Sequence, residues 1–419
     1  MRSQQGNKKQ LEASVLVTGL VVCALLAVSL GGYLMMIQAQ AATVARSQAW
    51  NSALTLAEAG AEEALAQLNP GTSVAVDFAA NGWGAPNGDI YGPKERQISN
   101  DSYTVYFSAS NLPTIYSTGF VSAPTLSRVI RVTTTNVPLF GVAMAAKLNI
   151  NLNGNGIFTD SFDSANPRLS TNGFYNPALT GTNGDIASLS GVINVGNATI
   201  NGDLYLGPSA VDTIRNGSVS GAVYNDFNAD FPDVALPVAL TSWIPASPLG
   251  IATNINGTSY TYFFGMSGDY SISASSGSIY VAAGARVRLY VTSNFGPSVI
   301  RVAGSGSGAG NLQIYMGGSS FTVSSQTMVD GGNAANLAYW GLPGNTSITF
   351  NGNASFVGTI YAPEADFTLG GGGSSTYDFC GSCVVKSITM NGHFSFHYDE
   401  NLWRAGPARG YVATSWREL

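Results

Sequence analysis

The sequence predicts a mostly β protein with one long N-terminal α-helix, then a small antiparallel sheet and a parallel β-solenoid. Three observations carry this prediction. A long apolar run continues with helical periodicity up to Leu68. Segments of alternating polar and apolar residues follow between positions 72 and 140. From Phe140 onward, apolar–polar–apolar triplets alternate with Asn-Gly, Gly-Asn and Gly-Gly turns. A β-sandwich with long loops is the alternative for this last region.

The composition narrows the class of protein. Only 10% of the 419 residues are charged, against about 25% in an average protein. Hydrophobic residues make up 45%, which is too apolar for an intrinsically disordered chain. The formal net charge of −6 provides no basic surface, so we expect no nucleic-acid partner. The chain therefore has the composition of an exported β protein with an uncharged polar surface.

The N-terminal helix begins with a segment that can cross a membrane. No Asp, Glu, Lys or Arg occurs from Ala13 to Ala45, and the apolar run Val15–Ile37 exceeds the roughly 20 residues that span a bilayer core. Arg2, Lys8 and Lys9 precede this run, which predicts a cytoplasmic N-terminus with the bulk of the chain periplasmic or extracellular. A removable secretory signal cleaved near Ala41 and a plain signal anchor are the alternatives.

The helical pattern continues beyond the apolar run. One apolar stripe recurs at three- and four-residue steps, and it consists of Trp50, Leu54, Ala57, Ala61, Ala64, Leu65 and Leu68. Asn69-Pro70-Gly71 then ends the helix, because proline lacks the N–H group that the helix needs. We therefore expect one uninterrupted helix, half in lipid and half packed against its own head.

This N-terminal region resembles type IV pilins and pseudopilins, particularly the PilX-like minor pilins. The resemblance lies in the basic leader, the segment Ala13–Thr18, the long apolar run and Leu56–Glu62. It implies that a peptidase cuts between Ala13 and Ser14, with Ala where Gly is usual, and that the new N-terminus is methylated. Thr18 stands where most pilins carry a glutamate. The resemblance therefore implies a minor subunit rather than the major filament subunit.

The sequence divides into four regions. Residues 1–13 form the leader, 14–69 the transmembrane and amphipathic pilin-like helix, 70–139 a small antiparallel β head, and 140–419 a Gly/Asn-rich β-solenoid with a C-terminal cap. The segments Asp160–Ser164, Val357–Ala365 and Phe396–Leu402 resemble parts of a domain that follows PilX-like helices in envelope proteins. This second resemblance implies an envelope or pilus-associated role and no reaction.

Two groups of residues are weak candidates for metal binding. His393 and His397 would share one face of a strand and could approach one metal with Asp399 or Glu400; capping of the last coil is the alternative. A second group offers oxygen ligands for Ca²⁺ but lacks the Gly and Glu that an EF-hand requires, and a surface turn is its alternative. This second group consists of Asp226, Asn228, Asp230 and Asp233.

Cysteines and acidic pairs are the remaining candidates for chemistry. Cys380 and Cys383 are expected to form a local disulfide in an oxidising exterior, since no second CxxC motif completes a zinc site. Paired carboxylates could serve a polysaccharide hydrolase or lyase. The pairs are Asp160/Asp163, Glu364/Asp366 and Asp399/Glu400. No G-x-S-x-G, P-loop or H-E-x-x-H motif is present, and no cofactor is expected.

These features predict a non-enzymatic, minor-pilin-like envelope protein in the bacterial cytoplasmic membrane or in surface pili. It would join or decorate a type IV pilus or pseudopilus and display the solenoid for adhesion or structural contact. Its expected partners are other pilin subunits, the membrane, and a surface glycan or host surface. The alternatives are a membrane-anchored polysaccharide lyase or hydrolase and a static envelope protein without a pilus link.

Overall fold

The chain forms two compact units in the computed structural model. The structure describes residues 4–69, 81–83, 87–110, 112–248, 253–324, 326–351, 354–371 and 377–419. The head unit contains the described residues of 1–68, 77–135 and 412–419, and the solenoid unit contains those of 69–76 and 136–411. Both units belong to the predicted class, a long helix followed by antiparallel and parallel β structure.

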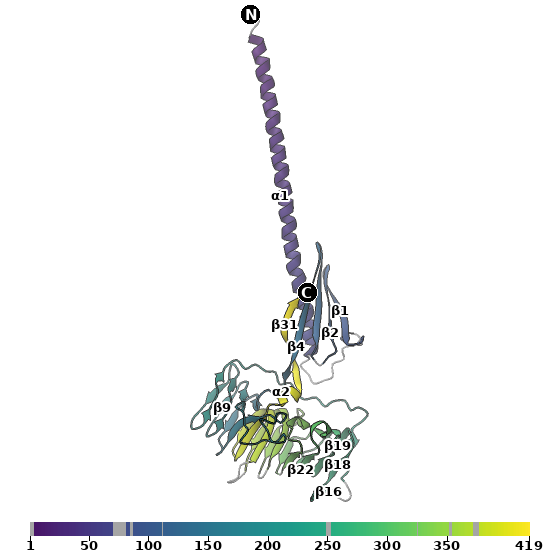
Figure 1. The fold of residues 1–419 in the computed structure, drawn as a ribbon, viewed down its shortest axis with the longest axis vertical. Coiled ribbons are helices and arrows are strands. Elements are labelled where there is room, and N and C mark those ends of the chain that lie inside the picture. The colour runs from purple at the N-terminus through teal and green to yellow at the C-terminus, as the bar shows by residue number, and fades with distance from the viewer. Residues whose placement is uncertain are drawn as a thin grey trace. The chain divides into compact units, whose positions relative to one another are not determined.

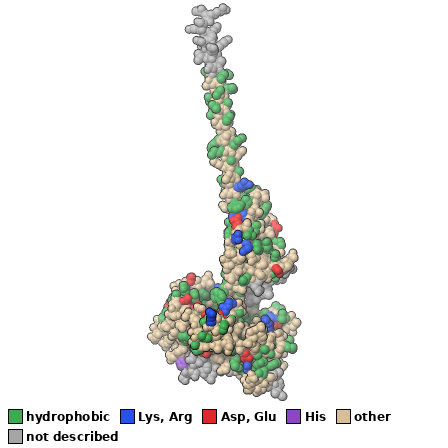
Figure 2. All heavy atoms as spheres, viewed as in Figure 1, with side chains coloured by type: hydrophobic (Ala, Val, Ile, Leu, Met, Phe, Trp, Pro, Cys, Tyr) green, Lys and Arg blue, Asp and Glu red, His purple; other side chains and the backbone are tan. Residues whose placement is uncertain are grey.

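The helix α1 runs without a break from Gln4 to Leu68 (Figure 1). Its 65 residues correspond to about 98 Å at 1.5 Å per residue. The large apolar side chains from Val15 to Val44 are exposed, and they cover the described part of the N-terminal half of the helix in Figure 2. The expected continuous helix is confirmed, and the glycines Gly31 and Gly32 do not interrupt it.

A five-stranded sheet packs against the C-terminal part of α1. Its strand order is β1-β2-β3-β4-β31, and β1 to β4 pair antiparallel. The strands are β1 (Ile90–Ile98), β2 (Asp101–Ser108), β3 (Thr114–Ser122), β4 (Thr125–Pro138) and β31 (Ala408–Glu418). The predicted alternation holds in β2, where Tyr103, Val105 and Phe107 are buried.

The last strand, β31, corrects the predicted domain boundary. Residues 140–419 were expected to form the solenoid and its C-terminal cap, but β31 is hydrogen-bonded to β4 in the head sheet. The amide of Leu419 donates to the carbonyl oxygen of Val129 at 2.9 Å, and the guanidinium of Arg128 is paired with Glu418. The solenoid is therefore an insertion between two neighbouring strands of one sheet.

The buried face of the helix is a ridge of alanines. The buried residues in the described part of the helix are Gly60 and five alanines spaced by three or four positions, Ala49, Ala53, Ala57, Ala61 and Ala64. Trp50 was expected on the buried stripe, but it is 47% exposed. The buried face passes through the adjacent position, Ala49. Small side chains let the helix lie close to the sheet.

Two glycines allow this close approach. A Cβ atom at Gly119 in β3 would lie 2.0 Å from the carbonyl oxygen of Ala53 and 2.6 Å from the backbone nitrogen of Ala57. A Cβ atom at Gly60 would lie 2.3 Å from the hydroxyl oxygen of Ser117. Because the atoms that oppose Gly119 are helix backbone, they cannot move aside as a side chain would.

Polar contacts fix the rotation of the helix near its end. Glu63 accepts a hydrogen bond from the Tyr103 hydroxyl at 2.6 Å and pairs with Lys94 at 3.0 Å and Arg96 at 2.7 Å. Partial burial acts to raise the pKa of Glu63, but the bonds from Tyr103 and Lys94 outweigh it and hold that pKa below its usual value. The charged form of Glu63 is therefore bound to two strands of the sheet.

The first arm of the solenoid unit consists of short parallel strands in three ladders. Each strand pairs with the corresponding strand of the next turn. The first ladder is β5 (Met144–Ala146), β8 (Ile186–Ser188), β11 (Leu204–Leu206) and β14 (Val223–Tyr224). The second is β6 (Ile150–Leu152), β9 (Val192–Asn194) and β12 (Val211–Thr213). The third is β7 (Phe158–Phe162), β10 (Thr199–Ile200) and β13 (Ser218–Val219).

The second arm repeats this parallel pairing over residues 244–399. One series is β15 (Ile244–Pro245), β19 (Gly268–Ile272), β21 (Arg286–Val291), β23 (Asn311–Met316), β26 (Leu337–Gly341), β28 (Phe356–Leu369), β29 (Tyr377–Met390) and β30 (Phe394–Asp399). Another is β18 (Tyr262–Phe264), β20 (Ser276–Val281), β22 (Gly296–Val302) and β25 (Thr327–Val329). The strands β24 (Ser320–Val323) and β27 (Ser347–Phe350) pair with each other, and β27 pairs with β28.

Three short helices and one hairpin complete the second arm. The hairpin is antiparallel and joins β16 (Thr253–Ile255) to β17 (Thr258–Tyr260). The helices are η1 (Gly306–Gly308), η2 (Ala334–Asn336) and α2 (Leu402–Ala405). Parallel ladders of this kind are the predicted solenoid rather than the alternative sandwich, because a sandwich is built from antiparallel sheets.

The two arms meet in the middle of the solenoid. Strand β29 pairs with both β5 and β6, and β30 pairs with β7. The chain therefore enters the stack of turns at its centre, winds out to β14, and crosses to the far end at β15. It then winds back through the second arm to β30. We call the contact of β5, β6 and β7 with β29 and β30 the seam.

Replacing Gly119 by alanine tests the close packing of the helix on the head sheet. We expect Gly119→Ala to lower the free energy of unfolding by about 1–3 kcal/mol, because the new methyl group meets helix backbone. Chemical denaturation of the full chain, followed by its helical circular dichroism, measures this loss. The matched control is Gly308→Ala, where a Cβ atom meets nothing within 4 Å. Equal stability of the two variants would contradict the packing described.

Candidate functional site

Polar and charged side chains gather at the seam. In the pairing of β7 with β30, Asp160 lies opposite His397 and Ser161 opposite Tyr398. The two segments lie 237 positions apart in the sequence, and each carries two of the acidic residues that the sequence singled out. We call the polar group at this place the seam network; it consists of Asp160, Ser161, Asp163, Ser164, Tyr175, Asn183, Asp378, His397, Asp399, Glu400 and Arg404.

His397 lies between two carboxylates. Its Nδ1 is 2.5 Å from an oxygen of Asp160, and its Nε2 is 3.4 Å from an oxygen of Asp378. The ring of Tyr175 stacks on the imidazole with 3.5 Å between centroids, and its hydroxyl donates to Asp160 at 3.0 Å. Burial acts to lower the pKa of His397, but the two carboxylates outweigh it and raise that pKa above its usual value.

Asp399 is a buried side chain whose hydrogen bonds connect three segments of the chain. One of its oxygens accepts hydrogen bonds from the backbone amides of Ser164 (2.9 Å) and Asn401 (3.2 Å). The other accepts from the Ser164 hydroxyl (2.7 Å) and the amide of Ala334 (3.2 Å). Burial raises the pKa of Asp399 despite these bonds. With both oxygens occupied and no exposed surface, Asp399 is a structural residue.

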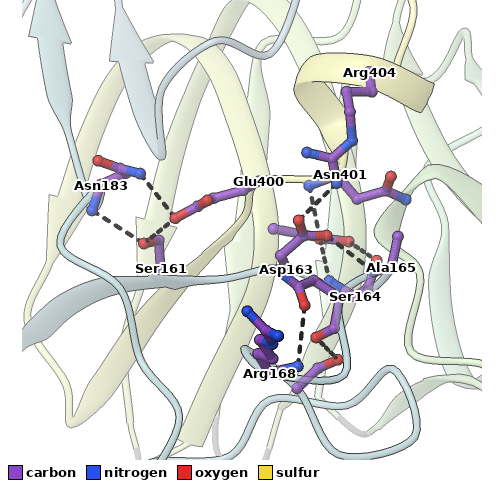
Figure 3. A network of polar contacts seen from close by, with 12 residues as sticks. Ser161, Asp163, Ser164, Ala165, Arg168, Asn183, Glu400, Asn401 and Arg404 are labelled. Carbon is purple, nitrogen blue, oxygen red and sulfur yellow. Dashed lines mark hydrogen bonds and ion pairs between the residues drawn. The ribbon is translucent and has the colours of Figure 1, made fainter.

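Glu400 and Asp163 complete the network (Figure 3). One oxygen of Glu400 accepts from the Ser161 hydroxyl at 2.7 Å and the Asn183 side-chain amide at 2.8 Å. Asp163 pairs with Arg404 of α2 at 2.6 Å. These bonds link the first arm to residues that follow β30, so the seam is joined by side chains as well as by strand pairing.

The structure does not support the predicted metal sites. His393 precedes β30, whereas both ring nitrogens of His397 face carboxylates. The calcium candidates are exposed on the connection between the arms; they are Asp226, Asn228, Asp230 and Asp233. Within the described parts of the chain, no group of three or more His, Cys, Asp or Glu residues could hold a metal ion. The four calcium candidates lie on an irregular exposed connection, and His393 lies outside the strand that carries His397.

The predicted disulfide is not formed. Cys380 and Cys383 are free thiols, and both are buried on the single strand β29. Residues three apart on an extended strand are separated by about 10 Å and point to opposite faces, beyond the reach of a disulfide. Burial raises the pKa of both thiols, so neither is a reactive thiolate.

The acidic pair Glu364/Asp366 is engaged in surface contacts. Glu364 pairs with Lys147 at 2.6 Å, and Asp366 accepts a hydrogen bond from the Ser387 hydroxyl at 2.6 Å. The acidic residues of the other two pairs lie in the seam network. The sequence showed the acidic residues but not their convergence, because nothing in the local pattern indicates that β7 and β30 are neighbours.

The residues implicated in processing lie on α1. The helix backbone includes Ala13 and Ser14, whose side chains are outside the described residues, and Thr18 is exposed. In the described chain, one helix is long and apolar enough to cross a membrane, and its candidate span begins at Val15. Cleavage after Ala13 stays a prediction.

Comparisons with known proteins find a matching family model and matching solved structures. A family model described as a domain of unknown function (DUF7305) matches residues 252–405, which make up most of the second arm and α2. Among solved structures, the competence-associated pilin ComZ from Thermus thermophilus matches with 13% sequence identity and a TM-score of 0.35. That alignment covers 88% of this chain and 97% of the pilin. No curated protein sequence matches the chain.

The pKa shifts predict that stability falls as the pH rises. The pKa of His397 is higher in the folded than in the unfolded protein. Its contribution to the free energy of unfolding is therefore fully present below the unfolded pKa of about 6.5, and it is lost as the pH rises through the folded pKa. The raised pKa of Asp399 acts in the same direction. We expect the free energy of unfolding, measured by urea denaturation, to decrease as the pH rises above about 6.5, the unfolded pKa of histidine.

Substitution of His397 separates its contribution from the others. His397→Gln should cost roughly 3 kcal/mol at about pH 6, because it leaves the buried Asp160 without a charged partner. It should also flatten the pH dependence above about pH 6. His393→Gln is the matched control and should leave the curve of the original protein unchanged. An unaltered pH dependence in His397→Gln would show that the histidine does not carry it.

Proposed function

We propose that the protein is a non-enzymatic, minor-pilin-like envelope protein. Its helix α1 would anchor it in the bacterial cytoplasmic membrane and join a type IV pilus or pseudopilus, and its solenoid would be displayed for adhesion or structural contact. The observation that carries the proposal is the unbroken helix Gln4–Leu68, exposed and apolar in its first half and packed on a sheet in its second.

The exposed apolar half of α1 needs a covering. Its side chains between Val15 and Ile37 lie outside the core of the head unit, and leaving them in water would cost about 25 cal/mol per Å² of apolar surface. Lipid covers such a surface, and so do the apolar helices of neighbouring subunits. The same helix can therefore serve as a membrane anchor and as an assembly surface without changing its sequence or structure.

The place of the solenoid in the sequence supports its proposed display by the head unit. It is inserted between β4 and β31, which are neighbouring strands of the head sheet. Two chain connections thus link it to the unit that packs on α1, whereas a terminal domain would have one. The solenoid itself has a charge-poor surface and a large inner core, as expected of a stable structural body.

The polysaccharide lyase or hydrolase is less well supported. Such an enzyme needs two carboxyl groups free to act on the substrate from either side of the bond. Asp160 and Asp163 are buried and bonded to protein groups, and Asp399 is fully enclosed. These three carboxylates bond to protein groups across the seam instead.

Mass spectrometry of the mature N-terminus tests the pilin assignment. We expect the protein from its native membrane to begin at Ser14 and to carry a methyl group on its amine. Ala13→Leu should prevent this cleavage and leave the precursor, because the peptidase requires a small residue before the cut. The matched control Ala41→Leu should mature normally, and the mature protein should co-fractionate with sheared surface filaments.

Each alternative gives a different result. A mature chain beginning at Ala42 or Thr43 would show a secretory signal and remove the helix from the mature protein. A chain that keeps Met1 would show a plain anchor. Correct processing without co-fractionation would leave a static envelope protein with no pilus link.

A further inference from the structure

A pocket of about 280 Å³ lies beside the seam network. Its walls come from the segment that leads into β5, the loop before β8, the end of β30, and α2. The lining residues are Gly141, Asn183, Asp185, Tyr398, Glu400, Trp403 and Arg404. Figure 3 shows that the side chains of Asn183 and Glu400 point toward each other at this place. The volume suits one small ligand group rather than a drug-sized molecule.

Two carboxylates give the pocket a surplus of negative charge. Both side-chain hydrogen bonds to Glu400 reach its Oε1, and the bond from the amide of Asp203 reaches Oδ1 of Asp185. Within the described contacts, the second oxygen of each carboxylate has no protein donor. The charge of Arg404 is already balanced by Asp163. A ligand with a positive group would therefore meet two acceptors that the protein leaves available.

The environment of Asp185 supports a cationic ligand. Burial is the largest cause that raises its pKa, to about 6, and the like charges of Asp203 and Glu400 add to it. A carboxylate held under these conditions is ionised at neutral pH, and Asp185 forms no ion pair with the described residues of the protein. A bound ammonium group would relieve both the burial cost and the repulsion.

Trp403 adds an aromatic surface. Its indole is 60% exposed, and it lies against Gly141, where a Cβ atom would come within 3.4 Å of the ring. An exposed indole near carboxylates can bind a cation by its face and can also pack against an apolar ring surface. The absence of a third acidic, His or Cys ligand within the described residues disfavours a metal ion here.

We propose that this pocket binds a hexosamine unit, with a free protonated amine, of a surface glycan. The amine would contact Asp185 and Glu400, the hydroxyl groups would bond to Asn183 and Arg404, and the sugar ring would pack on Trp403. A lysine side chain would satisfy the carboxylates but would offer no hydroxyl groups to Asn183 and Arg404 and no ring to Trp403. The proposal deepens the adhesive role proposed above and rests on it.

Calorimetric titration of the full chain in detergent with four probes tests the proposal. Glucosamine and its short oligomers should bind roughly tenfold more tightly than glucose, which lacks the amine, or N-acetylglucosamine, whose amine is capped. Lysine amide, which has the ammonium group but no sugar ring or hydroxyl groups, should bind more weakly than glucosamine. Affinity for glucosamine should increase between about pH 5 and pH 7, as Asp185 ionises.

Matched variants locate the binding. Asp185→Asn, Glu400→Gln and Trp403→Ala should each weaken glucosamine binding roughly tenfold while keeping the circular dichroism spectrum of the folded chain. Asp212→Asn on β12 and Trp416→Ala on β31, which lie outside the pocket, should bind normally. A variant that loses the folded spectrum is replaced by Asn183→Ala, which removes a rim donor without leaving a buried charge.

Three outcomes overturn the proposal. The first is equal affinity for glucose and glucosamine. The second is equal binding of glucosamine by the pocket variants and the control variants. The third is binding of lysine amide as tight as that of glucosamine, which would indicate a protein partner. Failure of the hexosamine to bind leaves the N-terminal processing result untouched. A chain that keeps Met1 removes the pilus role and leaves the sugar affinity unchanged, so the two failures are distinguishable.

Discussion

The parallel pairing of β7 with β30 is the contact on which the solenoid depends. The first strands of the first arm, β5 to β7, meet the last strands of the second arm, β29 and β30, at this seam. Neither group of strands has a neighbour on that side until the other arm is in place. Buried polar groups at the seam select one register, since both faces of β30 are buried and a shift of one residue would exchange them. His397 would lose Asp160, and Asp399 would lose the donors that Ser164 and Ala334 supply. The seam therefore couples the folding of segments that lie more than 200 positions apart.

The head unit solves a different packing problem. A helix with a long apolar half and a short packed half must be held firmly by the few turns that touch the sheet. Alanines on the helix and Gly119 on β3 permit backbone contact, and Glu63 binds two neighbouring strands. Close contact and a fixed rotation keep the exposed half of α1 in a defined orientation with respect to its own sheet.

Two neighbouring acidic residues, Asp399 and Glu400, have different roles because their surroundings differ. Asp399 is enclosed and receives donors on both oxygens, so it serves the fold. Glu400 receives its donors on one oxygen and borders a pocket with Asp185 and an exposed indole. A carboxylate whose two oxygens both receive hydrogen bonds from the protein serves the structure. A carboxylate with one oxygen left without a protein donor can bind a ligand.

The sequence by itself determined the long helix, the alternating strands of the head and the turn-rich solenoid, because these follow from periodicities within a few residues. It did not determine that β31 completes the head sheet, that the solenoid is entered at its middle, or that Cys380 and Cys383 lie on one strand. Nor did it show that Asp160 meets His397. Those features depend on which distant strands pair, and strand pairing is decided by the burial of whole surfaces. Only the tertiary structure could therefore show where the acidic residues converge.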